Sequence, residues 1–194
     1  GFYVISDEIY EKLIYDGEEH VSIASLGEEI YKQTIVINGV SKSYAMTGWR
    51  IGYTAGPLNV IKAMGSLQSQ VASGSNSIAQ YAAEEALRSP KGAEEIERMR
   101  RAYDERRRHI VARLNAIDGL KCVMPKGAFY VMVDMSALIG KHLGDHEITG
   151  SMDFASMLLE NADVALTPGS AFCSEGFCRI SYATSMENID KGVD

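Results

Sequence analysis

The sequence predicts an α/β fold with a largely parallel sheet, because short β-rich runs alternate with helical patterns along its 194 residues. A long, charged helical pattern separates two strand-rich sections, which indicates two domains. The composition, 46% hydrophobic and 23% charged residues, is typical of a folded chain and excludes a disordered one.

The expected strands are short runs of β-branched and aromatic residues, at residues 3–6, 34–38, 50–55, 129–133, 164–166 and 179–182. The expected helices repeat apolar residues at intervals of three and four, at residues 58–73, 78–88, 93–117 and 153–161. Glycine and proline between residues 119 and 127 end the longest helix. We place the domain junction near residues 90–118, which gives a first domain of residues 1–92 and a second of residues 93–194.

Both ends of the chain interrupt an expected element. The opening run from Gly1 to Ile5 is a buried-strand pattern with no polar lead-in. At the other end Ser185 is expected to cap a helix, with Asn188 in place of the usual Glu, and that helix stops after about two turns. We therefore interpret the chain as an excised piece of a longer protein.

The chain is acidic, with 26 acidic and 19 basic residues, a net charge of −7 and a pI of about 5.2. Negative charge repels phosphate backbones, so this segment is not expected to bind nucleic acid. A basic cluster between Arg98 and Arg108 is interleaved with acidic residues at spacings of three and four, which indicates ion pairs on a solvated helix face.

No segment indicates a membrane span, a secretion signal or a metal site. The longest apolar run, residues 128–133, is far shorter than the roughly 20 residues that a membrane helix needs. Cys122, Cys173 and Cys178 are an odd number of thiols, which is typical of a reducing compartment. No His or Cys pair stands near Cys173 and Cys178 to complete a zinc site. The sequence therefore predicts a cytoplasmic protein without a metal.

Three segments carry polar residues that a core does not need. In the first, Ser6-Asp7-Glu8-Ile9-Tyr10, Asp7 and Tyr10 directly follow an apolar strand. Ligands bind at the carboxyl ends of strands in open α/β sheets, so both are placed for a site. The alternative is that Asp7 only caps a helix over residues 8–13.

The second segment, residues 38–50, places Lys42 in a loop lined by Gly and Ser between two expected strands. A desolvated ammonium loses its proton more easily, as Schiff-base chemistry requires. Arg50 offers a planar fork that suits a phosphate. The alternative is a surface lysine and an arginine in an ion pair at the strand end.

The third segment joins Pro168-Gly169-Ser170-Ala171-Phe172 to a strand that opens with Arg179. A buried guanidinium without a partner is costly, so Arg179 needs an anion. That anion is either an internal carboxylate or the carboxylate of a substrate.

Together these motifs resemble the class I/II aminotransferases of the aspartate aminotransferase superfamily, which are fold-type I pyridoxal-phosphate enzymes. The resemblance rests on residues 6–10, on residues 41–53 (Ser-Lys-Ser-Tyr-Ala-Met-Thr-Gly-Trp-Arg-Ile-Gly-Tyr), on residues 168–172 and on residues 179–185, in that order. It implies the end of a large domain with a mostly parallel sheet, followed by a small α+β C-terminal domain whose last helix is truncated. The family's phosphate-binding turn and stacking aromatic ring have no counterpart here, so the chain alone is expected to be inactive.

The resemblance also implies a role for each site residue. Lys42 resembles the lysine that binds pyridoxal 5′-phosphate covalently and moves the substrate proton, and Asp7 resembles the carboxylate that keeps the pyridine nitrogen protonated. Tyr10 resembles the phenol that hydrogen-bonds the ring oxygen, and Arg50 resembles the phosphate anchor. Ser41 is assigned to the phosphate as the nearest hydroxyl, because many relatives carry a hydroxyl three residues before the lysine, where this chain has Gly39.

The implied reaction moves an amino group between an L-amino acid and a 2-oxo acid, of the aspartate or aromatic type. Arg179 resembles the residue that binds the α-carboxylate of the substrate. The family builds its sites at a homodimer interface, and residues 69–77 correspond to a segment that runs near the neighbouring subunit's cofactor.

Other interpretations remain open at this point. A carbon–sulfur lyase of the same fold often carries His where this chain has Tyr10, so Tyr10 favours transamination. An aminotransferase-like, ligand-sensing module of a transcription regulator would have its DNA-binding domain upstream. A structural α/β domain without a cofactor does not explain why Asp7, Lys42, Arg50 and Arg179 occur together.

Overall fold

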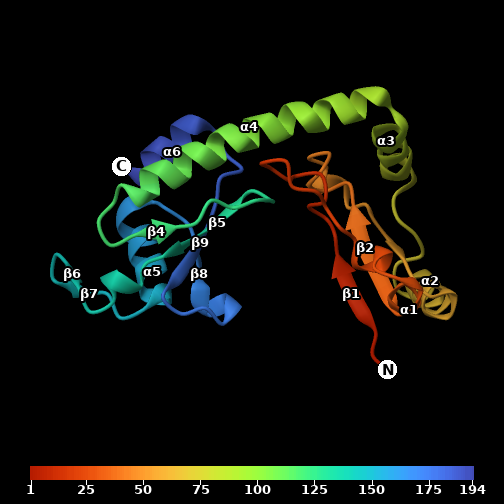
Figure 1. Ribbon diagram of the computed structural model, residues 1–194, viewed down its shortest axis with the longest axis horizontal. Coiled ribbons are helices and arrows are strands. Elements are labelled where there is room, and N and C mark those ends of the chain that lie inside the picture. The colour runs from red at the N-terminus through yellow and green to blue at the C-terminus, as the bar shows by residue number, and fades with distance from the viewer. The chain divides into compact units, whose positions relative to one another are not determined.

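The computed structural model describes all residues from Gly1 to Asp194 and confirms a mixed α/β fold. The chain divides into two compact units, Gly1–Arg100 and Arg101–Asp194, which are described separately below (Figure 1). The division falls inside the long helix α4 (Pro90–Asn115), the helix in which the sequence places the domain junction.

The first unit is built on a three-stranded sheet of β1 (Val4–Asp7), β2 (Thr34–Gly39) and β3 (Gly52–Ala55), in the order β1-β2-β3. β1 and β2 are parallel, whereas β2 and β3 are antiparallel. The expected parallel character therefore applies to only one pairing of this sheet. The strand expected from residue 50 begins at Gly52, because Arg50 has a left-handed backbone (φ 57°) and ends the 3-10 turn Thr47–Trp49.

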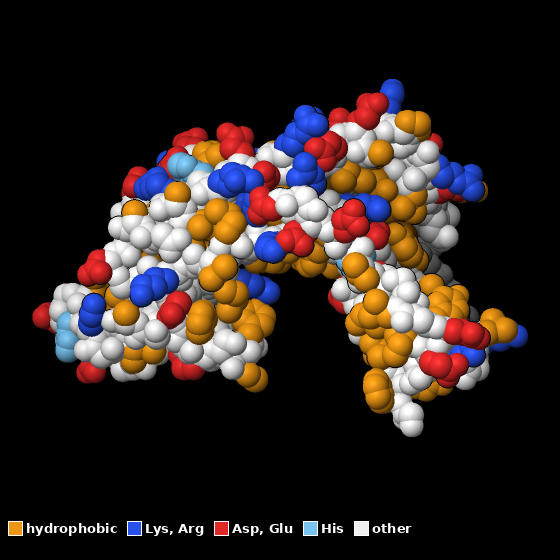
Figure 2. Space-filling model, in the orientation of Figure 1, with side chains coloured by type: hydrophobic (Ala, Val, Ile, Leu, Met, Phe, Trp, Pro, Cys, Tyr) orange, Lys and Arg blue, Asp and Glu red, His pale blue; other side chains and the backbone are white.

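Four helices belong wholly or partly to this unit: α1 (Glu28–Tyr31), α2 (Leu58–Val71), α3 (Ser77–Arg88) and the first part of α4. Asn76 caps α3, because its side-chain oxygen accepts the N–H of Ala79 at 3.0 Å. No residue of α2 is buried, and Leu67 and Val71 are largely exposed. Hydrophobic side chains also gather on the surface around β1 (Figure 2), where Phe2 and Ile5 are exposed.

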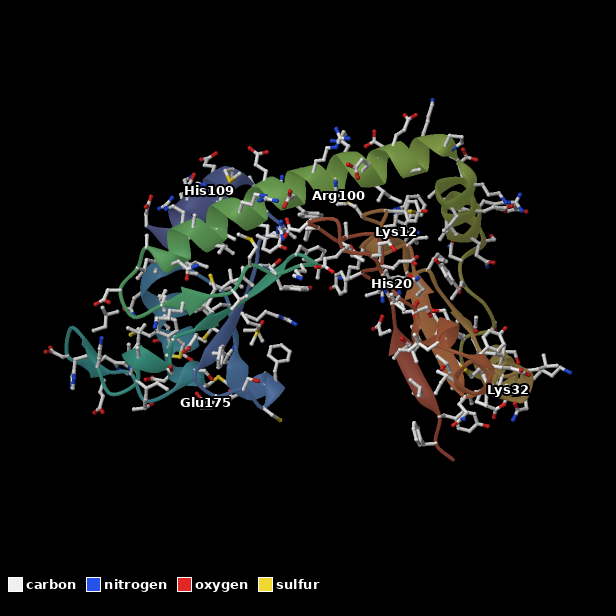
Figure 3. All side chains as sticks on the ribbon, in the orientation of Figure 1. Lys12, His20, Lys32, Arg100, His109 and Glu175 are labelled. Atoms are coloured by element: carbon white, nitrogen blue, oxygen red, sulfur yellow. The ribbon has the colours of Figure 1, made fainter.

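A buried carboxylate holds the loop that follows β1. Glu8 is only 7% exposed, and it accepts hydrogen bonds from the hydroxyls of Ser22 at 2.6 Å and Ser6 at 3.0 Å. Its other oxygen lies 2.9 Å from Nε2 of His20, which Figure 3 labels. Burial by itself would raise the pKa of Glu8, but the hydrogen bonds from Ser22, His20 and Ser6 outweigh it and lower the pKa below the ordinary value. The charged carboxylate therefore ties residues 20–22 to the end of β1.

The second unit contains an antiparallel sheet of β4 (Lys121–Cys122), β5 (Tyr130–Asp134), β9 (Phe177–Ser181) and β8 (Thr167–Pro168), in that order. Val131, Val133 and Cys178 are buried on one face, next to a core cluster that includes Met135 and Met157. Side chains alternate along a strand, so Tyr130 and Arg179 lie on the other face.

The remaining elements of this unit are a hairpin of β6 (His142–Leu143) and β7 (His146–Glu147), the helix α5 (Ser151–Ala162), the helix α6 (Met186–Val193) and the second part of α4. The expected cap of α6 is confirmed, because the Ser185 hydroxyl accepts the N–H of Asn188 at 3.1 Å. The strand expected at residues 164–166 is wrong. The N–H of Val164 donates to the carbonyl of Leu158 and ends α5, so the strand begins at Thr167.

One residue of the basic cluster differs from the solvated face that the sequence predicts. Arg107 is completely buried, and its guanidinium donates to the carboxylate of Asp104 and to the carbonyl of Pro125 at 2.6 Å. The other pairs fit the prediction, since Arg98 binds Glu95 and Arg108 binds Asp104. Cys122, Cys173 and Cys178 are free thiols, and no helix is long and apolar enough to cross a membrane.

Among the glycines of the second unit, Gly169 has the least room for a side chain. A Cβ at this position would lie 2.1 Å from the carbonyl oxygen of Ser174 and 2.4 Å from that of Phe177. Any side chain here would push the 3-10 turn Gly169–Phe172 away from the start of β9.

Replacing Glu8 by Gln should lower the free energy of unfolding of the first unit at neutral pH by about 1–3 kcal/mol, because hydrogen bonds to a charged carboxylate are lost. The pKa of Glu8 is depressed in the folded chain, so its stabilisation is present above about pH 4.5 and is lost as the pH falls through the folded value. Urea unfolding at several pH values, followed by the fluorescence of the single tryptophan, Trp49, measures both effects. Glu19→Gln, on an exposed residue, is the control. Equal acid sensitivity of wild type and Glu8→Gln would contradict the assignment.

Replacing Gly169 by Ala should destabilise the second unit by about 3 kcal/mol, because backbone oxygens cannot move aside as a flexible side chain can. The exchange of the β9 amide hydrogens should accelerate and can be followed by NMR. Gly192→Ala, in α6, is the matched control, since a Cβ there has no atom closer than 4.0 Å. Unchanged exchange in Gly169→Ala would show that the turn relaxes freely.

Candidate active site

The parallel pairing of β1 and β2 brings the first group of predicted site residues to one edge of the sheet. β1 ends at Asp7, which lies opposite Ile37 of β2, and Tyr10 follows in the next turn. β2 ends at Gly39, and Lys42 lies in the turn that comes directly after it. Parallel strands end at the same edge, so both polar segments lie there.

Asp7 ends a strand and begins a turn, rather than the helix over residues 8–13 that was the alternative. Its Oδ1 accepts the N–H of Ile9 at 3.1 Å, and the next residues form turns in which Leu13 donates to the carbonyl of Tyr10. The Asp7 side chain is exposed, whereas the neighbouring Glu8 is buried. This alternation gives the two adjacent carboxylates separate surroundings.

Lys42 and Tyr10 approach each other across the turns that follow the two strands. The Lys42 ammonium lies 5.9 Å from the centre of the Tyr10 ring, and both residues are half-buried. An ammonium at this distance is within reach of the negative face of the ring. The pair brings an amine that can act as a nucleophile close to a phenol.

The turn that carries Lys42 is fixed by Glu11 and Asn38, two residues that the sequence did not single out. Nδ2 of Asn38 donates to Oε1 of Glu11 at 3.0 Å, and Oδ1 of Asn38 accepts the N–H of Gly39 at 2.7 Å. The charge of Glu11 also helps burial to raise the pKa of Tyr44 and of Tyr53. A buried Asn inside an apolar strand was the signal in the sequence that could have found this anchor.

The position three residues before Lys42 has no room for a side chain. A Cβ on Gly39 would lie 2.9 Å from the carbonyl oxygen of Ile51 and 3.1 Å from Cα of Gly52. Gly39 therefore lets β2 and β3 approach closely, and the hydroxyl that many relatives carry here would not fit. Ser41 is half-buried, and its hydroxyl makes no hydrogen bond, so it is available to a ligand.

Arg50 follows Lys42 in the loop between β2 and β3 and lies on the wall of a pocket of about 660 Å³. The pocket is also lined by Ser75 and by Asn76, the N-cap of α3. One guanidinium nitrogen of Arg50 donates to the carbonyl of Thr47 at 2.8 Å, which leaves other N–H groups for a ligand. An arginine beside a helix N-terminus favours an anion.

Arg179 belongs to the second unit and pairs with Met132 of β5 and Thr167 of β8. It lines a small pocket of about 200 Å³ together with Tyr130, Leu166, Thr167 and Ser181. The guanidinium makes no ion pair and donates no hydrogen bond, although the side chain is half-buried. Of the two partners considered for Arg179, the internal carboxylate is not found, because no Asp or Glu of the chain pairs with its guanidinium.

Comparison with known proteins identifies the chain's relatives. The family model "Aminotransferase class I and II" matches residues 1–194. The aspartate aminotransferase of Bacillus sp. (strain YM-2) is 49% identical over 194 residues, and that of Geobacillus stearothermophilus is 47% identical over 197 residues. The matches cover 98% and 100% of this chain but only 47% and 48% of those proteins.

Solved structures give the same result. The aspartate aminotransferase from Rhizobium meliloti superposes with a TM-score of 0.93 at 43% identity, over 98% of this chain and 48% of that one. The aromatic aminotransferase from Pyrococcus horikoshii has a TM-score of 0.89 at 42% identity, with the same coverage. The chain thus spans about half the length of the relatives it matches. Because the family model covers every residue, the chain belongs to the class I and II aminotransferase family.

Proposed function

We propose that this chain is the part of a pyridoxal-phosphate-dependent aminotransferase that holds the cofactor covalently and binds the substrate's α-carboxylate. The whole enzyme would transfer an amino group between an L-amino acid and a 2-oxo acid, of the aspartate or aromatic type. The observation that carries the proposal is the arrangement of Asp7, Tyr10 and Lys42 at the carboxyl ends of two parallel strands. Relatives named aspartate aminotransferase support it.

The groups around the proposed site fit pyridoxal 5′-phosphate. A primary amine, an exposed carboxylate and a phenol lie at one edge of the sheet, and Arg50 lines a pocket at a helix N-terminus where a phosphate is favoured. When bound, this cofactor serves as the electron sink for a substrate carbanion. Asp7 would bind the protonated ring nitrogen, Tyr10 would donate to the ring oxygen, and Arg50 and Ser41 would bind the phosphate.

Lys42 would have two tasks in the reaction. Its amine would hold the cofactor covalently, and the same amine would move the proton that leaves the substrate's α-carbon. The Tyr10 ring lies beside the ammonium, with 5.9 Å between Nζ and the centre of the ring. Arg179 would hold the substrate's α-carboxylate by two parallel hydrogen bonds and so orient the α-carbon.

We also propose that the full-length protein is a cytoplasmic homodimer. Residues 69–77 run from the last turn of α2 to the first residue of α3 and carry mostly small or polar side chains, which permit a close approach of another chain. The helix α2 has no buried residue within this chain, and its exposed apolar side chains include Leu67 and Val71. Such a face is usually covered in an assembly.

Reduction with borohydride in the presence of pyridoxal phosphate should place the phosphopyridoxyl group on Lys42 of the purified chain. Peptide mapping by mass spectrometry identifies the labelled lysine, and Lys42→Arg is the control in which this label should disappear. The exposed Lys32 and Lys62 report non-specific labelling. Equal labelling of Lys42, Lys32 and Lys62 would contradict the assignment of the covalent lysine.

The chain alone should show no measurable transamination, because the residues needed to fix the cofactor before reaction are incomplete. Fusion to the complementary part of the Bacillus sp. (strain YM-2) relative should restore activity toward aspartate or an aromatic amino acid. In that fusion Arg179→Lys should raise the KM for the amino acid roughly 10- to 100-fold, since lysine lacks the two-point fork. The affinity for pyridoxal phosphate should change much less. A loss confined to cofactor affinity would show that Arg179 is structural.

A further inference from the structure

The guanidinium of Arg179 is held by aromatic rings instead of an anion. Its Cζ lies 4.5 Å from the centre of the Tyr130 ring and 4.5 Å from the centre of the Phe172 ring. The same guanidinium makes no ion pair and no hydrogen bond. Both rings present their negative faces to the cation, which offsets part of the cost of its partial burial.

The register of the sheet places the first of these rings. Tyr130 of β5 pairs with Ser181 of β9, and Met132 pairs with Arg179. Tyr130 is therefore the diagonal neighbour of Arg179 on the same face, a spacing that aromatic and long side chains can bridge. The opposite face carries the buried Val131 and Cys178, and their burial fixes the face of the sheet that Tyr130 and Arg179 occupy.

The turn after β8 places the second ring. Gly169 packs against the carbonyls of Ser174 and Phe177, which brings the turn Gly169–Phe172 onto the start of β9. Ser170 donates its N–H to the hydroxyl of the buried Ser151 at 3.1 Å, and Glu175 accepts the N–H of Ser151 at 2.5 Å. Glu175 is labelled in Figure 3. These hydrogen bonds fix the turn to the start of α5.

We propose that Tyr130 and Phe172 are positioning residues for Arg179, and this inference rests on the proposed role of Arg179 in binding the α-carboxylate. Ring faces attract the guanidinium without using any of its N–H groups, which point outward in its plane. The donors therefore remain available for a carboxylate, whereas an internal Asp or Glu would have occupied them. The two rings hold the side chain ready and reduce the conformational freedom that it loses on binding.

NMR of the Arg179 Nε–Hε group in the 194-residue chain tests this directly, with the signal assigned by its loss in Arg179→Lys. A proton near an aromatic face resonates upfield, so this signal should lie upfield of the other arginine signals. Titration with sodium acetate, against sodium chloride at equal ionic strength, should shift it saturably. Phe172→Leu and Tyr130→Leu should each remove part of the upfield shift and weaken acetate binding roughly two- to fivefold.

Matched variants separate a positioning role from simple packing. Tyr130→Phe and Phe172→Trp keep a ring and should retain both the shift and the acetate affinity. Phe177→Leu removes an aromatic residue of β9 on the same face whose ring does not stack on the Arg179 guanidinium, and it should change neither. Backbone amide spectra confirm that each variant is folded. If a Leu variant loses its folded spectrum, the Met variant at the same position (Phe172→Met or Tyr130→Met), which has a flexible apolar side chain without a ring, replaces it.

The outcomes distinguish this proposal from the proposed function. If wild type binds acetate at Arg179 and the ring-deleting variants bind it equally well, the rings do not position Arg179 and the inference is overturned. If wild type shows the upfield signal but no response to acetate, the carboxylate contact itself is wrong, and the proposed function loses its substrate-binding residue. Loss of affinity only in the variants that lack a ring supports the proposal.

Discussion

The candidate site depends on the parallel pairing of β1 with β2. Parallel neighbours end at the same edge, so the residues that follow each strand are brought together although more than thirty positions separate Asp7 from Lys42. Gly39 lets β2 and β3 approach closely where the loop that carries Lys42 and Arg50 joins them. A strand slipped by one residue would turn Asp7 into the protein and Glu8 into solvent.

Two carboxylates, the buried Glu8 and the half-buried Glu11, hold the turns that follow β1. Glu8 accepts hydrogen bonds from Ser6 and Ser22 and contacts His20. Glu11 accepts a hydrogen bond from Asn38, whose Oδ1 accepts the N–H of Gly39. The two acidic residues lie on either side of Tyr10 in the sequence, so both ends of the turn that presents the phenol are anchored. Hydrogen bonds to charged groups are the stronger class in proteins, which suits a segment with no helix or strand of its own.

The sequence predicts the regular elements well because their signals are local. Apolar spacing located α2, α3, α4 and α5 to within a few residues, and Ser185 caps α6 as expected. The strand at residues 164–166 failed because its first amide closes the preceding helix, a competition that β propensity does not describe. Glu8 and Arg107 were treated as part of polar runs, since their burial depends on Ser22 and on Pro125, which are distant in the sequence.

The residues proposed to bind the cofactor and the substrate are placed by different kinds of force. Around Lys42, hydrogen bonds to the carboxylates of Glu8 and Glu11 set the geometry. Around Arg179, close packing at Gly169 and two aromatic faces set the geometry. A guanidinium that is held by aromatic rings keeps its N–H donors free. A residue that binds a new substrate carboxylate in each turnover needs such free donors. An arginine with a structural role would instead be saturated, as Arg107 is by Asp104 and the Pro125 carbonyl. This contrast between two arginines of the same unit is the physical reason for proposing a ligand at Arg179 and none at Arg107.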